Sequence, residues 1–140
     1  MVVMVPAILV AEKYGRMKWV FNGAIALLLL VQLGFGFLAH GRYALFLWLS
    51  LFFVAFNVLE AIQPSLISRI APHYAKGAAL GIYNTTQSLG LFVGGLLGGM
   101  LLKFSGALSV WLVAAMLALL WLGVALGMEI PVARVRQATR

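Results

Sequence analysis

The sequence predicts an all-α fold, a polytopic bundle of membrane-spanning helices. Of its 140 residues, 64% are hydrophobic and only 9% are charged, whereas soluble domains carry about 25% charged residues. The apolar residues also form long runs, and short basic segments separate these runs. Since a span needs ~20 apolar residues, the length of the chain allows about four or five membrane helices.

The composition also excludes several classes of function. The formal charge is +7, but the basic residues lie in the gaps between apolar runs, so we expect no nucleic-acid partner. The chain has no cysteine, which excludes disulfides and thiolate metal sites. His40 and His73 stand alone, and neither has a second ligand at metal spacing. The sequence has no nucleophile–base pair, phosphate loop or dinucleotide motif, so we expect neither an enzyme nor a cofactor.

The first part of the chain contains one partial and one complete span. Residues 1–11 are apolar, but as a helix they would reach only ~16 Å, about half of the hydrocarbon thickness. They resemble the end of a helix whose beginning is missing. Residues 20–39 form the first complete span, and we expect Gly34 and Gly36 to loosen its end. The sequence HGR at 40–42 predicts a short turn.

Three further spans follow. The second covers residues 43–70 and is longer than the bilayer requires, so we expect tilt, a kink or protrusion. The third covers 78–103 and begins with a polar half, GIYNTTQS. After a short turn, the fourth span covers 107–128 and is apolar throughout. The tail at 129–140 is too short to form a domain.

The distribution of Lys and Arg predicts the orientation. Segment 12–19 carries three of these residues, 69–76 two and the tail three, whereas the turns at 40–42 and 103–106 carry one each. The two sets of segments alternate along the chain, as consecutive membrane helices require. The positive-inside rule therefore predicts a multi-pass inner-membrane protein whose C-terminus is cytoplasmic.

One helical turn of the second span combines an acid with a proline. Asn57, Glu60 and Pro64 are spaced by three and four residues, so they share one helix face. Pro64 cannot donate its backbone hydrogen bond, and its ring clashes with the carbonyl of Glu60, which predicts a kink. Gln63 lies off this face and is the weaker candidate for a site residue.

An acid inside a membrane span is a candidate functional residue. Burial in an apolar environment disfavours the charged carboxylate, so we expect Glu60 to take up and release a proton. Two structural explanations stay open. Glu60 could lean toward cytoplasmic water, or it could be paired permanently with a polar neighbour.

The third span holds a second polar group, formed by Tyr83, Asn84 and Gln87 with Ser88. Polar side chains at this depth must face protein or water, because lipid offers no hydrogen-bond partners. They could line a cavity opposite Glu60, or they could form hydrogen bonds between helices, and the sequence favours neither.

Glycines follow in the same span at spacings of four. Such ridges of small residues let the backbone of another helix approach closely. The ridge could serve static packing or a sliding surface, and its partner could be a helix of this chain or of a missing part. The residues are Gly90, Gly94, Gly95, Gly98 and Gly99.

The order of these features resembles the major facilitator superfamily of transporters. Residues 12–18, EKYGRMK, resemble its acidic–basic–x–Gly–Arg–x–basic cytoplasmic loop, in the copy between helices eight and nine. Residues 56–61, FNVLEA, with Pro64 after them, resemble helix ten of a YajR-type, drug-efflux-like subgroup. Matches to helix eleven of this subgroup are Lys76, Gly77, Gly81, Tyr83 and Gln87.

The resemblance implies a fold of two six-helix halves with the substrate between them and alternating access by rocking. This chain would supply the end of helix eight and helices nine to twelve of the C-terminal half. Its partner would be the missing N-terminal half or a second copy. The family's loop begins with a glycine where this chain has Ile8. The cytoplasmic gate would consist of Glu12, Lys13, Gly15 and Arg16.

These observations predict proton-coupled efflux of small lipophilic compounds. Glu60 would be the proton site, and Asn57, Tyr83, Asn84 and Gln87 would line the path. The expected partners are the lipid bilayer and a small-molecule substrate. Two alternatives stay open: a four-helix protein that transports as a homo-oligomer, and a non-transporting scaffold or assembly subunit that uses the glycines for partner contacts.

Overall fold

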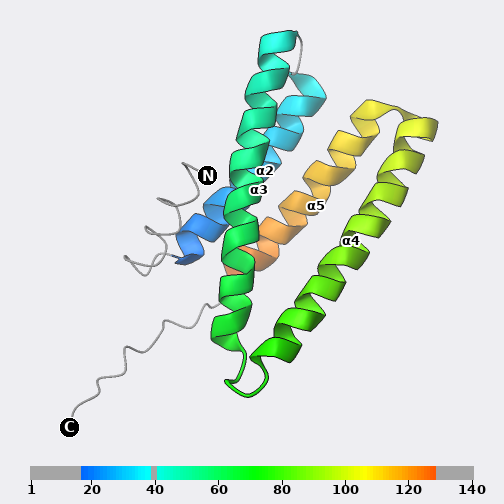
Figure 1. Cartoon of the computed structure of the whole chain (residues 1–140). Coiled ribbons are helices and arrows are strands. Elements are labelled where there is room, and N and C mark those ends of the chain that lie inside the picture. Colours follow the sequence, from blue (N-terminus) through cyan, green and yellow to red (C-terminus); the bar gives the residue numbers. More distant parts are fainter. Residues whose placement is uncertain (1–16, 39–40, 129–140) are drawn as a thin grey trace.

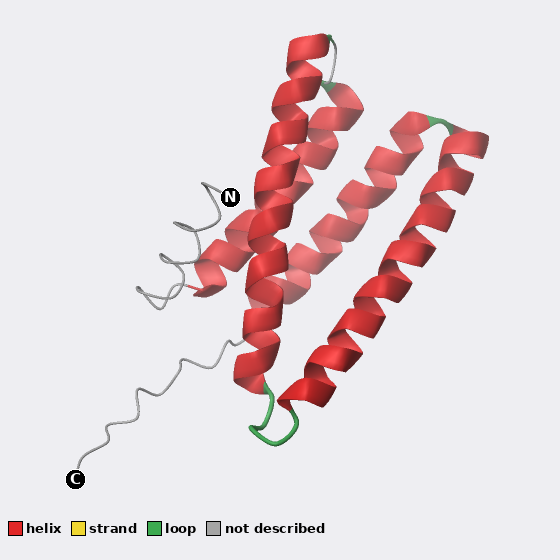
Figure 2. Ribbon diagram, in the orientation of Figure 1, coloured by secondary structure: helices red, strands yellow, loops and turns green. Residues whose placement is uncertain are grey.

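The structure is a computed structural model that describes residues 17–38 and 41–128. This part of the chain forms helices, and Figure 2 shows no strand in it. Each helix is long and apolar enough to cross a membrane, so the predicted all-helical membrane fold is confirmed. Each begins and ends within one turn of the expected span. In chain order they are α2 (Met17–Phe37), α3 (Arg42–Ile70), α4 (Lys76–Ser105) and α5 (Ala107–Gly127).

Glycine and proline define the ends of the helices. Gly41 precedes α3 and Gly106 joins α4 to α5, with φ of 89° and 82°. This left-handed region costs other L-residues roughly 1–2 kcal/mol, but glycine adopts it freely. α3 ends where Pro72 follows, because the residue before a proline is driven out of the helical region. That residue, Ala71, is extended, with φ −66° and ψ 138°.

α2 is the centre of the packing. It lies along both α3 and α5, whereas α4 contacts α3 and α5 but not α2 (Figure 1). Ile25 and Val31 of α2 and Ala55 of α3 are fully buried. Lipid is as apolar as these side chains, so close van der Waals packing stabilises the core rather than exclusion of water. The main buried cluster consists of Met17, Phe21, Ala24, Ile25, Val58, Leu59, Ile62, Leu66 and Ala125.

Two aromatic pairs join α2 to α5. Phe21 meets Trp121 edge to face, with ring centroids 6.0 Å apart. Phe35 stacks on Trp111 at 4.7 Å. Aromatic pairs of this kind contribute about 0.5–1.5 kcal/mol beyond the area that they bury. They fix the contact between α2 and α5 near both ends of α2.

Gly34 allows α2 and α3 to approach closely. A Cβ atom added at Gly34 would lie 2.5 Å from ring atoms of Trp48, a distance that real Cβ atoms do not reach. α2 continues through Gly34 and Gly36 and ends at Phe37, so the prediction that these glycines loosen the end of the span stays a prediction. The missing side chain of Gly34 makes room for an indole.

α4 stands apart from this core. None of its 30 residues is buried. At each predicted packing glycine, an added Cβ would meet no atom of the described residues within 4 Å. No described helix packs closely on the ridge, although Gly98 and Gly99 line a cavity to which Val110 and Trp111 of α5 also contribute. We call this ridge the glycine face; it comprises Gly90, Gly94, Gly95, Gly98 and Gly99.

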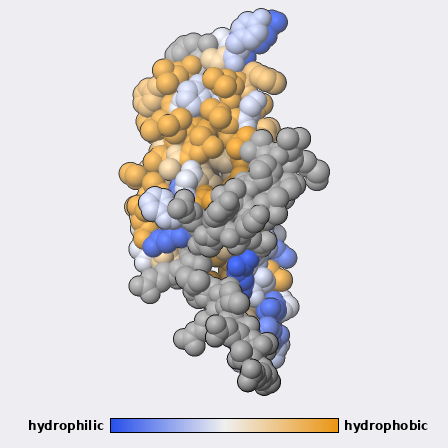
Figure 3. Space-filling view, turned by 90° about the vertical axis from the view of Figure 1, so that its left-hand side faces the viewer, coloured by the Kyte–Doolittle hydropathy of each residue, from blue (hydrophilic) through white to orange (hydrophobic). Residues whose placement is uncertain are grey.

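The helices alternate in direction, which separates their connections into two sets. The start of α2, the α3–α4 turn and the end of α5 lie at one end of the bundle, and the other two connections lie at the opposite end (Figure 1). In Figure 3, apolar surface covers the upper part of the face shown, and the hydrophilic residues gather mainly toward the lower end. We call the first end the basic end; it carries Lys18, Arg69, His73 and Lys76.

The helices also differ in length. α3 and α4 have 29 and 30 residues, whereas α2 and α5 have 21 each. At 1.5 Å per residue the long pair spans ~44 Å and the short pair ~32 Å, compared with about 30 Å of hydrocarbon. Figure 1 shows the α3–α4 turn extending beyond α2 and α5 at the basic end.

Candidate functional site

Glu60 lies at a pocket to which every described helix contributes. Its volume is about 260 Å³, and we call it the acid pocket. α3 supplies most of the wall, α2 and α5 supply the base, and α4 supplies a single residue. The lining residues are Leu28, Gln32, Phe52, Phe56, Leu59, Glu60, Gln63, Gln87 and Trp121.

The walls of the acid pocket combine two chemistries. Three glutamines, Gln32, Gln63 and Gln87, bring amide groups from three different helices to the pocket that Glu60 lines. The rings of Phe52 and Phe56 stack with their centroids 5.9 Å apart. The indole of Trp121, on α5, also lines the pocket. The rings present apolar surface to a small molecule. The amides and the carboxylate provide hydrogen bonds and one ionisable position.

A hydrogen bond between α3 and α4 closes one side of the acid pocket. The Tyr83 hydroxyl donates to Oε1 of Gln63 at 2.7 Å. Side-chain bonds between membrane helices contribute about 0.6 kcal/mol on average. Because this bond occupies Oε1, the amide nitrogen of Gln63 is left to donate elsewhere. Tyr83 was predicted to line the site, but it is not among the residues that line the acid pocket, and it contacts the pocket only through its bond to Gln63.

The described helices do not bury Glu60. Its side chain is exposed, and no polar or charged residue of the described part is buried. The described helices alone do not bury this acid, so its burial in the complete carrier stays a prediction. In a bilayer an uncovered carboxylate would face hydrocarbon, which is costly unless protein or water covers it.

Pro64 modifies the same turn without ending the helix. α3 continues through it to Ile70. Because proline has no backbone N–H, the carbonyl of Glu60 receives no helical hydrogen bond from it. Glu60 thus contributes a carboxylate and a carbonyl that lacks its usual helical donor. The kink at Pro64 stays a prediction.

Two further predicted path residues, Asn57 and Asn84, also lie outside the acid pocket. Asn57 is exposed, and its amide donates to the Phe53 carbonyl of its own helix at 2.7 Å. Asn84 is exposed on α4 and does not line the pocket. Neighbouring hydroxyl groups also bond within α4: Thr85 to Gly81, Thr86 to Ile82 and Ser88 to Asn84. Most of the polar half of α4 is therefore satisfied locally.

One polar residue of the acid pocket, Gln32, was not predicted, and Gln63 was ranked as the weaker candidate. Oε1 of Gln32 is buried and has no hydrogen-bond partner among the described residues. The sequence did contain a signal for Gln32, because it is an amide inside an apolar span, where lipid offers no hydrogen-bond partner. Gln63 was ranked low because it lies off the Asn57–Glu60–Pro64 face. Its spacing of three from Glu60 was the better guide, because such residues are neighbours on a helix.

The gate-loop residues Glu12, Lys13, Gly15 and Arg16 lie outside the described residues. So do the partial span at 1–11 and the tail at 129–140. Their predicted roles stay predictions.

Comparison with known proteins identifies the family. The model of the Major Facilitator Superfamily matches residues 1–140. The chain is 41% identical to the inner membrane transport protein YajR of Escherichia coli (strain K12) over 127 residues, which are 91% of the chain and 28% of YajR.

Two shorter matches are to transporters of unassigned function in Buchnera aphidicola. One, from subsp. Baizongia pistaciae, is 34% identical over 82 residues, 59% of the chain and 21% of the relative. The other, from subsp. Schizaphis graminum, is 39% identical over 67 residues, 47% of the chain and 17% of the relative. The chain thus spans between 17% and 28% of the length of these three relatives. With its four membrane-length helices, the chain belongs to the Major Facilitator Superfamily.

Proposed function

We propose that this chain is part of a carrier that exports small lipophilic compounds in exchange for protons. One observation carries the proposal. The acid of the described chain, Glu60, lines the pocket to which all four described helices contribute. The other charged side chains of the described part are basic and lie near the two ends of the bundle.

The chemistry of the acid pocket supports exchange. When Glu60 is protonated, the pocket is neutral and its aromatic walls suit a lipophilic compound. When Glu60 is ionised, the amide groups of Gln63 and Gln87 are the nearby donors that could stabilise the carboxylate. Alternating access would load the proton on one side of the membrane and release it on the other. The resemblance to YajR, named an inner membrane transport protein, supports the inner membrane, and the distribution of Lys and Arg supports a cytoplasmic C-terminus.

A further part of the carrier would cover Glu60 and the glycine face. Both surfaces are open in the described helices. The carboxylate of Glu60 is unsuited to contact with lipid, and the glycine face allows another helix to approach closely. The missing N-terminal half would supply this cover. A second copy of the chain is the alternative, and the two can be distinguished by crosslinking.

The crosslinking test uses the absence of cysteine in the chain. Gly94→Cys introduces a single thiol on the glycine face, and oxidation in membranes reports whether two copies meet there. A disulfide-linked dimer would favour the homo-oligomeric carrier. A monomeric product would favour cover by a different chain segment. Gly23→Cys on α2 is the control for random collision, since Gly23 is also exposed with open space around it.

The functional test is Glu60→Gln in the complete carrier, assayed by accumulation of a lipophilic dye in everted vesicles, where export is directed into the lumen, over a range of external pH. We expect Glu60→Gln to abolish the pH-dependent component of export, because glutamine cannot exchange a proton. Asn84→Ala is the control, since Asn84 is polar and on α4 but lies outside the acid pocket. Unchanged export by Glu60→Gln at every pH would remove Glu60 from the mechanism.

A further inference from the structure

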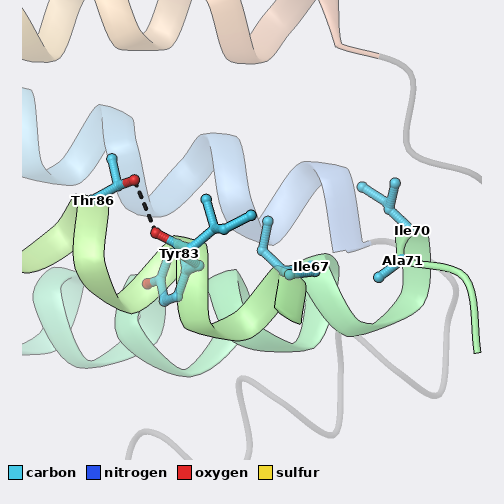
Figure 4. A pocket seen from close by; sticks show the side chains of 7 residues that line it. Ile67, Ile70, Ala71, Tyr83 and Thr86 are labelled. Carbon is cyan, nitrogen blue, oxygen red and sulfur yellow. Dashed lines mark hydrogen bonds between the residues drawn. The ribbon is translucent and has the colours of Figure 1, made fainter. Parts of the chain in front are cut away.

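A second cavity lies between α3 and α4 beside their turn. Its volume is about 400 Å³, and we call it the turn groove. Figure 4 shows its labelled side chains along the two helices, from Ile70 and Ala71 near the turn to Tyr83 and Thr86. The lining residues are Ile67, Ile70, Ala71, Ala79, Ile82, Tyr83 and Thr86. The function proposed above makes no use of this cavity.

The turn groove is separate from the acid pocket and differs from it in chemistry. Tyr83 lines the groove, and its hydroxyl is already engaged by Gln63 of the acid pocket. The other hydroxyl of the wall, on Thr86, donates to the Ile82 carbonyl at 2.9 Å. The remaining lining side chains are aliphatic. Because the hydroxyl hydrogens of Tyr83 and Thr86 are both used in hydrogen bonds, the groove presents an apolar slot to a ligand.

The slot is open to its surroundings. Ile70 is 55% exposed and Ile82 is 70% exposed. The lining on α4 from Ala79 to Thr86 covers eight residues, or ~10 Å along the helix axis. That length is about a third of the hydrocarbon thickness. Because the groove lies beside the turn, it lies near one surface of the membrane.

Basic residues lie near the end of the groove at the turn. Lys76, Ala79, Tyr83 and Thr86 are spaced by three, four and three residues, so Lys76 shares the groove face of α4. His73 lies in the turn, and Arg69 precedes Ile70. The acid of the described chain, Glu60, is ten residues before Ile70, ~15 Å away along α3. An apolar slot with a basic mouth complements a molecule that has an apolar chain and an anionic head.

We propose that the turn groove binds an anionic phospholipid of the surrounding bilayer. The acyl chain would lie against Ile67 and Ile82, and the phosphate would lie at Lys76 and His73. Anionic lipids are attracted to basic residues near the membrane surface, and the aliphatic walls receive the chain without displacing a hydrogen bond. The proposal does not depend on proton coupling, so it stands or falls separately from the role of Glu60.

The test measures lipid retention by native mass spectrometry of the 140-residue chain released from nanodiscs. The nanodiscs contain equal amounts of phosphatidylglycerol and phosphatidylcholine with the same acyl chains. We expect the retained lipid to be enriched in phosphatidylglycerol. Lys76→Gln should lower that enrichment about fivefold, the size expected for one basic residue near an anionic surface. Lys103→Gln, at the opposite end of α4, should leave it unchanged.

A second pair of variants tests the slot itself. Ala79→Phe fills the groove and should abolish retention of phosphatidylglycerol. Ala78→Phe adds the same ring at the adjacent residue, which does not line the groove, and should retain the lipid. Equal retention of both lipids by the unmodified chain would overturn the proposal, as would equal effects of Lys76→Gln and Lys103→Gln. Displacement of the phospholipid by an equal mole fraction of laurate would reassign the groove to free amphipathic anions and overturn its assignment to a phospholipid.

Discussion

α2 and α4 are both apolar helices of membrane-spanning length, yet they relate to the rest of the chain in opposite ways. α2 has 21 residues and buries six of them, including Phe21 and Ile25. α4 has 30 residues and buries none. Hydropathy places both helices in the membrane, but only α2 buries residues against its neighbours, whereas α4 contacts α3 and α5 without burying any. α2 therefore organises the bundle, whereas α4 displays surface.

Glycine illustrates the same contrast. Gly34 of α2 is buried against Trp48, and Gly94 of α4 has open space where a Cβ would stand. Both residues are glycines inside membrane helices, so their helix propensity is the same. In lipid, close packing rather than water exclusion decides how helices associate. The surroundings of each glycine therefore decide its contribution, and substitution of matched residues can measure the difference.

The largest effect is expected from Phe21→Ala compared with Phe92→Ala. Phe21 is 5% exposed and pairs with Trp121, whereas Phe92 of α4 is 70% exposed. Loss of the buried ring should lower the free energy of unfolding by about 3–5 kcal/mol, because the core cannot close the cavity. Loss of the exposed ring should change it by less than about 0.5 kcal/mol. Unfolding by SDS in mixed micelles measures both, and equal effects would show that the two helices are packed alike.

Glycine-to-alanine substitutions should have opposite signs on the two helices. Gly34→Ala forces a methyl group into the Trp48 ring, and overpacking of this kind costs about 1–3 kcal/mol. Gly94→Ala meets no described atom and should stabilise the isolated chain by up to about 1 kcal/mol, since alanine favours the helix. The same SDS titration reports both values. In the complete carrier, a loss of assembly on Gly94→Ala would reveal a partner on the glycine face.

The smallest effect is expected at the contact that ties α4 to α3. Tyr83→Phe removes the hydrogen bond to Gln63 and should lower the free energy of unfolding by about 0.6 kcal/mol. A double-mutant cycle with Gln63→Leu isolates the bond from the other contacts of both side chains. Additive effects of the two substitutions would mean that the bond contributes nothing in the membrane. Thr86→Val is a control, because Thr86 bonds within its own helix.

Sequence reasoning predicted the helices well because hydropathy is a local sum over ~20 residues. It also identified Glu60 and Gln87, since polar groups stand out in apolar spans. It gave Gln63 too little weight and missed Gln32, because the acid pocket is formed by helices that meet only in the folded chain. For the same reason, local spacing did not reveal that Glu60 is exposed in the described helices. Burial depends on neighbours that local spacing does not reveal.

The glycines show this limit most clearly. The spacing of Gly90, Gly94 and Gly98 indicated that a helix could approach, but the described chain places none there. Gly34, which belongs to no such motif, makes the closest approach to a neighbouring helix. A motif of small residues shows where contact is permitted. The partner, in this chain or outside it, decides where contact occurs.

The single-residue link at Gly106 has a consequence for biosynthesis. α4 ends at Ser105 and α5 begins at Ala107, and the Ser109 hydroxyl closes the turn on the Gly106 carbonyl at 2.6 Å. A connection this short gives the two helices no freedom to enter the bilayer separately. α4 leaves the ribosome first, without buried contacts of its own, and must wait for α5 to be inserted as one hairpin. Replacement of Gly106 by a β-branched residue should therefore reduce the yield of inserted protein more than it changes the structure of the protein that is inserted.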